Sequence, residues 1–259
     1  MREGQLSFHE AFSLSGKVAL VTGGGSGLGY AMAAAFRAAG AQVVITGRRV
    51  EVLDQAVARL GPGTFAFEHD VTDSSSAVGL VKRISQEIGT PTILVNNAGV
   101  HLKKPVCNTT YEEFYGVLNT HIGGAFSMTQ AVIPEMRQMG HGSILFIASM
   151  TSLIGMPNVI AYSAAKSGYV GMVRALASEL GPDNIRVNAI APGWIETPML
   201  HKALDGDPLR KAKILSRTPQ ERFGTPSDIG WSAVYLSSSS ASFINGIVLP
   251  VDGGASIGF

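Results

Sequence analysis

Residues 18–29 decide the fold, and they read Val-Ala-Leu-Val-Thr-Gly-Gly-Gly-Ser-Gly-Leu-Gly. The apolar run Val18–Thr22 predicts a buried strand, and the glycines that follow predict a tight turn. A helix is predicted next, because small and apolar residues form one stripe at helical spacing. The stripe consists of Leu28, Ala31, Met32, Ala35, Phe36 and Ala39. The stretch therefore predicts a strand, a glycine-rich turn and a helix in direct succession.

Six further runs predict strands, and helical patterns fill most of the gaps between them. The runs are 42–46, 64–68, 93–95, 143–148, 186–190 and 247–251. Such alternation implies parallel pairing through right-handed crossovers. We predict an α/β fold, a Rossmann-type doubly wound parallel sheet of about seven strands in three α/β/α layers. It forms a single domain, 14–259, after an N-terminal arm, 1–13. A (β/α)₈ barrel would need an eighth strand and would leave the glycines unexplained.

The composition excludes several classes of protein. Hydrophobic residues make up 46%, charged residues 15%, and the formal net charge is +1. This is too apolar for a disordered chain, and no apolar run is long enough to span a bilayer. No dense Lys/Arg run suggests nucleic acid or an anionic membrane as a partner. A single cysteine, Cys107, excludes an internal disulfide, and the first residues do not read as a signal peptide, so we expect a cytoplasmic protein.

The glycine-rich turn predicts a site for a diphosphate. Gly23 can turn sharply, Gly27 lets the backbone approach phosphate, and Gly29 lets the helix pack closely. The helix N-terminus then offers unpaired N–H groups and the positive end of its dipole. A P-loop is excluded, because no Gly-Lys-Ser/Thr follows the turn. The alternative is an ordinary glycine-rich turn that binds nothing.

The end of the second predicted strand bears on the identity of the cofactor. An acidic residue there would bind a ribose 2′-hydroxyl and repel a 2′-phosphate. The sequence instead has Thr46-Gly47-Arg48-Arg49, and an arginine can offer a charged, planar fork to a phosphate. We therefore predict NADP(H) and keep NAD(H) as the alternative. The arginines could also be solvated charges at the start of a helix.

A candidate catalytic group lies further along the chain. Tyr162 and Lys166 share one face of a predicted helix, and Ser149 stands thirteen residues before the tyrosine. A free tyrosine, with a pKa of about 10, is a poor base near neutrality, and lowering that pKa by ~3 units takes roughly 4 kcal/mol. An adjacent ammonium and a nicotinamide cation have the right sign. Ser149 could orient a substrate oxygen. A lone Tyr-x-x-x-Lys is a weak motif and is more often a plain helix face.

At this point the sequence resembles the short-chain dehydrogenase/reductase family over nearly its whole length. The motifs are Thr22-Gly23-x-x-x-Gly27-x-Gly29, Asp70-Val71, Asn96-Asn97-Ala98-Gly99, Ser149, Tyr162-x-x-x-Lys166, and Pro192-Gly193 with Ile195 and Thr197. The resemblance implies that Tyr162 is the general acid/base. It implies that Lys166 holds the nicotinamide ribose and lowers the tyrosine pKa, and that Ser149 positions the reacting oxygen.

The resemblance also implies the cofactor contacts and the assembly. Asp70 and Val71 would contact adenine, Asn97 and Gly99 would line the cofactor, and Ile195 and Thr197 would hold the carboxamide. The other expected cofactor contacts are Gly23, Gly25, Ser26, Gly27, Leu28, Gly29, Arg48, Arg49, Ala98, Tyr162, Lys166, Pro192 and Gly193. The family's fold is a seven-stranded Rossmann sheet, usually assembled as a homotetramer through its long helices.

One position departs from the family's pattern. Many relatives carry a catalytic asparagine in a stretch like Asn-x-x-Gly-x-Phe, and counting back from Gly124 and Phe126 places His121 there. Asn119 is two residues away and would point elsewhere on a regular helix. A neutral His121 could make one hydrogen bond in place of the asparagine and could add a titration near neutral pH. Alternatively it is a packing histidine and the proton path differs.

The other histidines, His9, His69, His101, His141 and His201, show no metal-ligand spacing, so we predict no catalytic metal.

The preferred function is reversible hydride transfer between NADP(H) and a small-molecule secondary alcohol or ketone, with the proton passing through Tyr162. The motifs resemble those of sugar-acid and polyol dehydrogenases such as gluconate 5-dehydrogenase, and also those of 3-oxoacyl-carrier-protein reductases. An alternative of another class is a cofactor-binding module with impaired catalysis, which His121 alone favours. Substrate identity is expected to depend on residues 196–223, which resemble a lid, although a surface helix pair would look similar.

Overall fold

A computed structural model describes residues 7–197, 200–201, 204 and 206–258. Seven parallel strands form one sheet in the order β3-β2-β1-β4-β5-β6-β7. The strands are β1 (Val18–Thr22), β2 (Gln42–Gly47), β3 (Thr64–Glu68), β4 (Pro91–Asn96), β5 (Gly142–Ile147), β6 (Ile185–Pro192) and β7 (Val248–Val251). All seven predicted strands are therefore confirmed, with bounds that differ from the prediction by two residues or fewer.

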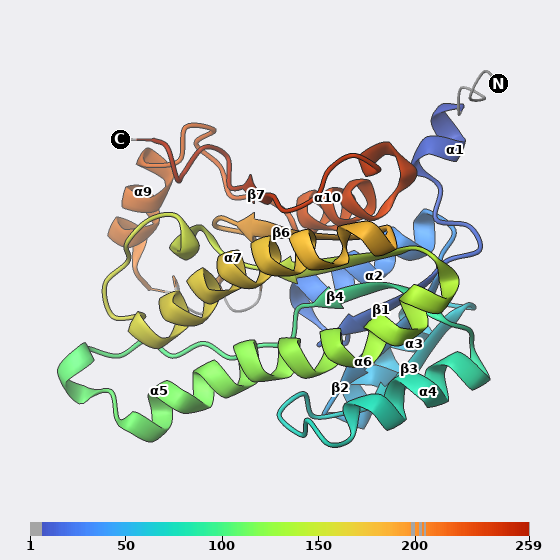
Figure 1. The fold of residues 1–259 in the computed structure, drawn as a ribbon. Helices are drawn as coiled ribbons and strands as arrows, with labels where there is room; N and C mark the ends of the chain where they lie inside the picture. The colour runs from blue at the N-terminus through green and yellow to red at the C-terminus, as the bar shows by residue number, and fades with distance from the viewer. Residues whose placement is uncertain (1–6, 198–199, 202–203, 205, 259) are drawn as a thin grey trace.

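Helices cover both faces of this sheet (Figure 1). They are α1 (Phe8–Phe12), α2 (Gly27–Ala38), α3 (Val50–Leu60), α4 (Ala77–Glu87), α5 (Tyr111–Leu118), α6 (Gly124–Met139), α7 (Ile160–Leu180), α9 (Pro208–Ser216) and α10 (Pro226–Ser237). Helices α2, α3 and α10 pack on one face, and α4, α6 and α7 pack on the other. The three-layer Rossmann-type fold predicted from the sequence is confirmed.

The two-sided cover explains the composition of the central strands. Every residue of β1, β4 and β5 is buried, so these strands read as continuous apolar runs instead of alternating patterns. Phe36 and Ile45 belong to the core on the α2 face, and Phe146 and Tyr169 belong to the core on the α7 face. The buried sheet therefore holds the ends of its strands in fixed positions.

The strand order reverses between β1 and β4, and ligands of open α/β sheets bind at such a point, beyond the carboxyl ends of the strands. Here the two strand ends are joined by hydrogen bonds. The Asn97 side-chain amide donates to the carbonyl oxygens of Thr22, at 2.9 Å, and Gly23, at 3.2 Å. The Thr22 hydroxyl accepts from the backbone N–H groups of Asn97 and Ala98, both at 3.0 Å. The glycine-rich turn is thus anchored to the neighbouring strand.

The N-terminal arm contains a helix that the sequence did not reveal. Helix α1 begins after a capping box between Ser7 and Glu10, and the Phe12 ring lies 6.3 Å from that of Tyr235 on α10. At 5 residues, α1 is too short for a helical repeat to be recognised. Residues 1–6 of the predicted arm lie outside the described residues. Within the part of the chain that the structure describes, no helix is both long and apolar enough to cross a membrane.

Candidate active site

The glycine-rich turn has the shape that a diphosphate needs. A Cβ at Gly29 would lie 2.3 Å from the Gly23 carbonyl oxygen, so α2 begins directly against the turn. At Gly27 the backbone has φ +55° and a Cβ would meet nothing within 4 Å, which leaves open space over the turn. Ser26 is the N-cap of α2, and its side chain makes no capping hydrogen bond. The first N–H groups of α2 therefore remain available to an anion.

The remaining predicted residues of this turn contribute packing. A Cβ at Gly25 would lie 3.1 Å from the Val52 side chain of α3, and Leu28 is half-buried against the core on the α2 face. The absence of a side chain at Gly25 thus lets α3 approach the turn closely, and Leu28 packs α2 against the core.

Polar side chains meet at the ends of β2 and β3. Arg48 is 68% exposed, and its guanidinium lies 3.8 Å from the Asp70 carboxylate. Hydrogen bonds from Thr72, its backbone N–H above all, hold the pKa of Asp70 below the usual value, and the nearby Arg48 adds to this effect. Val71 is buried beneath α6, where a Cβ at Gly124 would lie 2.8 Å from it. Arg49 stands apart, since its exposed side chain makes no hydrogen bond or ion pair with the described residues.

Ser149, Tyr162 and Lys166 come together beyond the carboxyl end of β5. The Lys166 ammonium is buried and donates to the Ile147 carbonyl oxygen at 2.5 Å, and it lies 5.5 Å from the centre of the Tyr162 ring. The Ser149 hydroxyl accepts from the Thr151 N–H at 3.2 Å and hydrogen-bonds the Tyr162 side chain. The strand end and α7 thus place a hydroxyl, a phenol and an ammonium side by side.

Burial is the main influence on the pKa of Tyr162 and of Lys166. That Lys166 lowers the pKa of Tyr162 stays a prediction of the family resemblance; in this structure burial raises that pKa, and the Ser149 hydrogen bond opposes the rise. Burial also lowers the pKa of Lys166 to about 7. The physical reason is the same for both groups, because withdrawal from water disfavours the charged form of each.

Comparison with known proteins identifies the family of this chain. The family model described as enoyl-(acyl carrier protein) reductase matches residues 23–256. The chain belongs to the short-chain dehydrogenase/reductase family. It is an oxidoreductase of that family, as the sequence predicted.

Relatives within the family differ in the substrates that they are named for. The chain is 36% identical to the 3-oxoacyl-[acyl-carrier-protein] reductase of Thermotoga maritima, over 93% of this chain and 98% of the relative. It is 34% identical to the gluconate 5-dehydrogenase of Gluconobacter oxydans, over 97% of this chain and 99% of the relative. It resembles the structure of a gluconate 5-dehydrogenase from Burkholderia cenocepacia J2315 in complex with NADP and tartrate, with a TM-score of 0.93 and 29% identity. That match covers 98% of this chain and 100% of the other.

His121, at the family's asparagine position, lies in a π-helical turn, η2 (Asn119–Gly123), rather than in a regular helix. Its side chain is 1% exposed, whereas Asn119 is exposed. The Nε2 atom lies 2.8 Å from the Val100 carbonyl oxygen and 3.2 Å from the Val100 nitrogen, and the buried Nδ1 atom has no partner among the described residues. The ring stands edge-on to Tyr162, with the centroids 5.6 Å apart. His121 therefore belongs to the same cluster as the catalytic candidates.

The environment of His121 does not support a titration near neutral pH. Burial, reinforced by the charge of Lys166, lowers the pKa of the imidazole to about 3. The sequence allowed such a titration because it could not show how deeply the ring is buried. Gly99 covers the ring from the other side, and a Cβ there would lie 2.2 Å from the His121 Cε1 atom.

The loop after β4 carries two further residues that sequence reasoning did not assign, His101 and Lys103, and the first of them lies at the site. The His101 ring lies 4.9 Å from the Tyr162 ring. Partial burial lowers the pKa of His101, and the charge of Lys103 on the same loop lowers it further. The available signal was their position directly after Asn96-Asn97-Ala98-Gly99, but His101 was considered only as a metal ligand.

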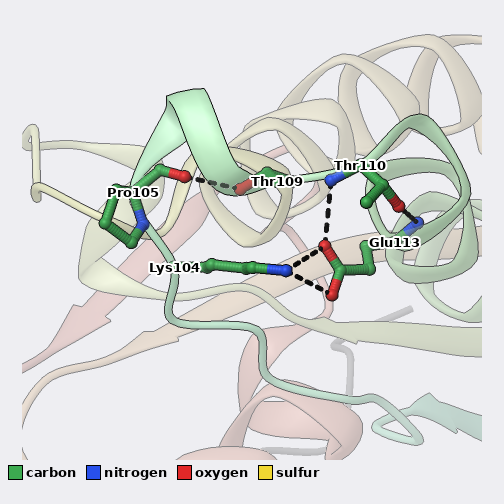
Figure 2. Close-up of polar contacts among 5 residues, drawn as sticks. All are labelled: Lys104, Pro105, Thr109, Thr110 and Glu113. Atoms are coloured by element: carbon green, nitrogen blue, oxygen red, sulfur yellow. Dashed lines mark hydrogen bonds and ion pairs between the residues drawn. The ribbon is translucent and has the colours of Figure 1, made fainter.

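Lys104 fastens this loop to the start of α5, as Figure 2 shows. Its ammonium contacts both Glu113 carboxylate oxygens, at 2.8 and 2.9 Å. One of those oxygens also accepts from the Thr110 N–H, so Glu113 caps the helix and binds the loop at once. The Lys104 N–H additionally donates to the Asn158 carbonyl oxygen at 2.7 Å.

The last predicted cofactor contacts follow β6. A Cβ at Gly193, directly after Pro192, would lie 2.6 Å from the Asp252 Cα atom, so the C-terminal segment crosses closely here. Ile195 is buried and pairs with Gly224 in an isolated bridge. The Thr197 hydroxyl accepts from the Leu200 N–H at 3.3 Å. These residues lie at the carboxyl edge of the sheet, and their roles toward a cofactor remain predictions.

No group of three or more His, Cys, Asp or Glu side chains within the described ranges could hold a metal ion, and the absence of a catalytic metal stays a prediction.

Proposed function

We propose that this oxidoreductase catalyses reversible hydride transfer between NADP(H) and the secondary alcohol or ketone of a sugar acid or polyol. The observation that carries the proposal is the cluster of Ser149, Tyr162 and Lys166 beyond β5, within reach of the switch point of the sheet. The relationship to gluconate 5-dehydrogenases supports this substrate class.

The residues at the switch point fit a dinucleotide. The Gly27 and Ser26 backbone would hold the diphosphate, since the turn is open above Gly27 and the α2 N-terminus lacks a side-chain cap. Arg48 would bind a 2′-phosphate. Two observations favour this role: the Arg48 side chain is exposed, and no acidic residue stands at the end of β2. The similar structure of the Burkholderia cenocepacia gluconate 5-dehydrogenase contains NADP, which supports NADP(H) as the cofactor, and NAD(H) is the alternative. When bound, the cofactor supplies or accepts the hydride through its nicotinamide ring.

The side chains of the cluster each have a different role in proton transfer and in positioning the substrate. Tyr162, whose raised pKa keeps the phenol protonated at neutral pH, donates its proton to the ketone oxygen during reduction. The Ser149 hydroxyl holds that oxygen in place beside the phenol. The Ile147 carbonyl fixes Lys166 beneath the tyrosine, where the ammonium stabilises the phenolate that remains. His121 positions the loop after β4 through Val100.

A positive charge on the loop after β4 supports an anionic substrate. His101 lies beside Tyr162, and Lys103, two residues further along the same loop, takes part in no hydrogen bond or ion pair with the described residues. Its ammonium is available to a carboxylate, which suits a sugar acid. A 3-oxoacyl thioester is the second candidate substrate, supported by the identity to the Thermotoga maritima reductase.

We further propose that residues 14–259 form one domain in which 196–223 act as a substrate lid. The Ile195–Gly224 bridge holds the two ends of that segment together, so the segment leaves the sheet and returns to it at the same place. Residues 198–199, 202–203 and 205 of it lie outside the described residues. A cytoplasmic location is consistent with the single, exposed, free Cys107.

Turnover measurements with a matched variant test the function. Purified protein is assayed with NADPH and NADH against sugar-acid ketones, polyol-derived ketones and 3-oxoacyl thioesters. We expect turnover of a sugar-acid ketone with NADPH, and a fall of about 10²–10⁴-fold in kcat for Tyr162→Phe. Cofactor binding, measured by fluorescence, should survive that substitution. If cofactor binds and no substrate turns over while His121→Asn restores activity, the impaired binding module is correct instead.

A further inference from the structure

A cavity opens at the edge of the sheet opposite the candidate active site. Its volume is about 190 Å³, enough for several water molecules or a small ligand. It lies below the beginnings of β1, β4, β5 and β6 and beside the end of α10, and Lys17, Thr92, Arg186 and Ser237 line it. Gly23 and Ser149 follow the other ends of these strands, so the cavity is separate from the site of hydride transfer.

Two cations enter the cavity without an acidic partner. Arg186 donates to the carbonyl oxygens of Leu236, at 2.7 Å, and Ser238, at 3.3 Å. Lys17 makes one long contact, 3.4 Å, to the Ser237 carbonyl oxygen. None of the described residues that line the cavity is acidic. Burial lowers the pKa of both groups, and the charge of Arg186 lowers that of Lys17 further, because the two positive charges repel each other.

Two hydroxyls in the same lining are also unsatisfied. The Thr92 residue is 5% exposed and Ser237 is fully buried, and neither side-chain oxygen has a hydrogen-bond partner among the described residues. Buried polar groups in folded proteins are nearly always hydrogen-bonded, so each exception calls for an explanation. Both oxygens are closed off from solvent in this structure, so each hydroxyl would have to rotate toward the cavity to meet a ligand there.

A purely structural role accounts for only part of this arrangement. Arg186 satisfies carbonyls at the C-terminal end of α10, as cations commonly do. That role leaves two of the three Lys17 N–H donors without a partner and does not involve either hydroxyl. The site therefore has donors and positive charge in excess of what the fold needs.

We propose that this cavity binds a small oxyanion of the phosphate class, held by the Lys17 ammonium with Arg186 as the second positive charge, and that the Thr92 and Ser237 hydroxyls rotate toward the bound anion. The shared chemistry is a tetrahedral, doubly charged group, either free phosphate or the phosphoryl group of a metabolite. The site goes beyond the proposed dehydrogenase function and does not depend on it.

Phosphate titration of the full chain tests the proposal. The protein is saturated with NADP⁺ to occupy the cofactor's own phosphate contacts, and sodium phosphate is titrated by calorimetry with chloride replaced to hold ionic strength constant. We expect saturable binding, which Lys17→Gln weakens by at least about tenfold, because a charged hydrogen-bond donor is lost. Lys82→Gln on α4, an exposed cation elsewhere, should bind phosphate like the wild type.

Two conservative variants keep the test independent of folding defects. Thr92→Val and Ser237→Ala remove oxygens that have no partner among the residues that the structure describes, and together they should weaken phosphate binding several-fold with an unchanged circular dichroism spectrum. Glycerol phosphate in a parallel titration distinguishes the sources, because tighter binding of the ester points to a metabolite and tighter binding of phosphate to the free ion. Absence of saturable binding of both compounds, or wild-type affinity in Lys17→Gln, would overturn the proposal.

Discussion

Burial, more than charge pairing, sets the protonation of the residues around Tyr162. Desolvation is the largest influence on the pKa of Tyr162, Lys166 and His121, and it favours the neutral form of each. For His121 this effect is large enough to measure through stability, since its pKa of about 3 lies far below that of a histidine in an unfolded chain.

We expect His121→Asn to reduce the acid sensitivity of the fold. Between pH 6.5 and about 3 the unfolded wild-type chain binds one more proton at position 121 than the folded chain. The free energy of unfolding therefore falls as the pH drops below 6.5, and at pH 5 this histidine accounts for a loss of about 2 kcal/mol. The variant lacks this histidine and therefore this loss, so its free energy of unfolding, measured by urea titration, should fall less between pH 7 and pH 5.

The matched control for this measurement is His9→Asn on the exposed helix α1, which should keep the wild-type dependence on pH. Equal losses of stability in the wild type and His121→Asn would contradict the buried, neutral state of His121.

At the scale of secondary-structure elements, the Lys104–Glu113 contact links the loop after β4 to α5 (Figure 2). Glu113→Ala removes both that contact and half of the capping box at Thr110. We expect a loss of about 1 kcal/mol in unfolding free energy, typical of a helix cap. Because the loop carries His101 beside Tyr162, KM for the ketone should rise while KM for the cofactor stays the same.

Glu87→Ala provides the comparison, since it also removes an ion pair, with Arg83, from an exposed helix surface. Its effect on stability should stay within about 0.5 kcal/mol, and both KM values should be unchanged. A rise of cofactor KM in Glu113→Ala that equals the rise of ketone KM would show that the loop does not act on the substrate alone.

The elements differ in how far the sequence could predict them. The seven strands and α2 were predictable, because long apolar runs and helical stripes record burial directly. Helix α1 and the π-helical turn at His121 were not, since each is too short to impose a periodic pattern. The grouping of Ser149, Tyr162 and Lys166 followed from the family's motifs, but their protonation depended on burial, which no local pattern encodes.

For the molecule as a whole, we propose the homotetramer that the family resemblance implies. Helices α5, α6 and α7 lie along the near side of Figure 1 and expose several large apolar side chains. These are Tyr111, Tyr115, Phe126 and Ile160. Exposed apolar groups of this size mark protein interfaces when they gather on one surface.

We expect Phe126→Glu to lower the mass of the assembly measured by light scattering after gel filtration. Phe126 is 54% exposed in the single chain, and a buried, unpaired carboxylate would oppose association. Val78→Glu on α4 changes a residue that is 49% exposed outside these helices and should leave the mass unaltered. A tetramer that persists in Phe126→Glu would place the interface elsewhere.

The contact between Gly99 and His121 also orders the substitutions that this chain can accumulate. Any side chain at position 99 would place its first carbon where the imidazole now stands. A smaller residue at position 121 removes that clash, whereas a side chain added at position 99 while His121 is present would collide with the imidazole. The effects of substitutions at positions 99 and 121 are therefore expected to be non-additive.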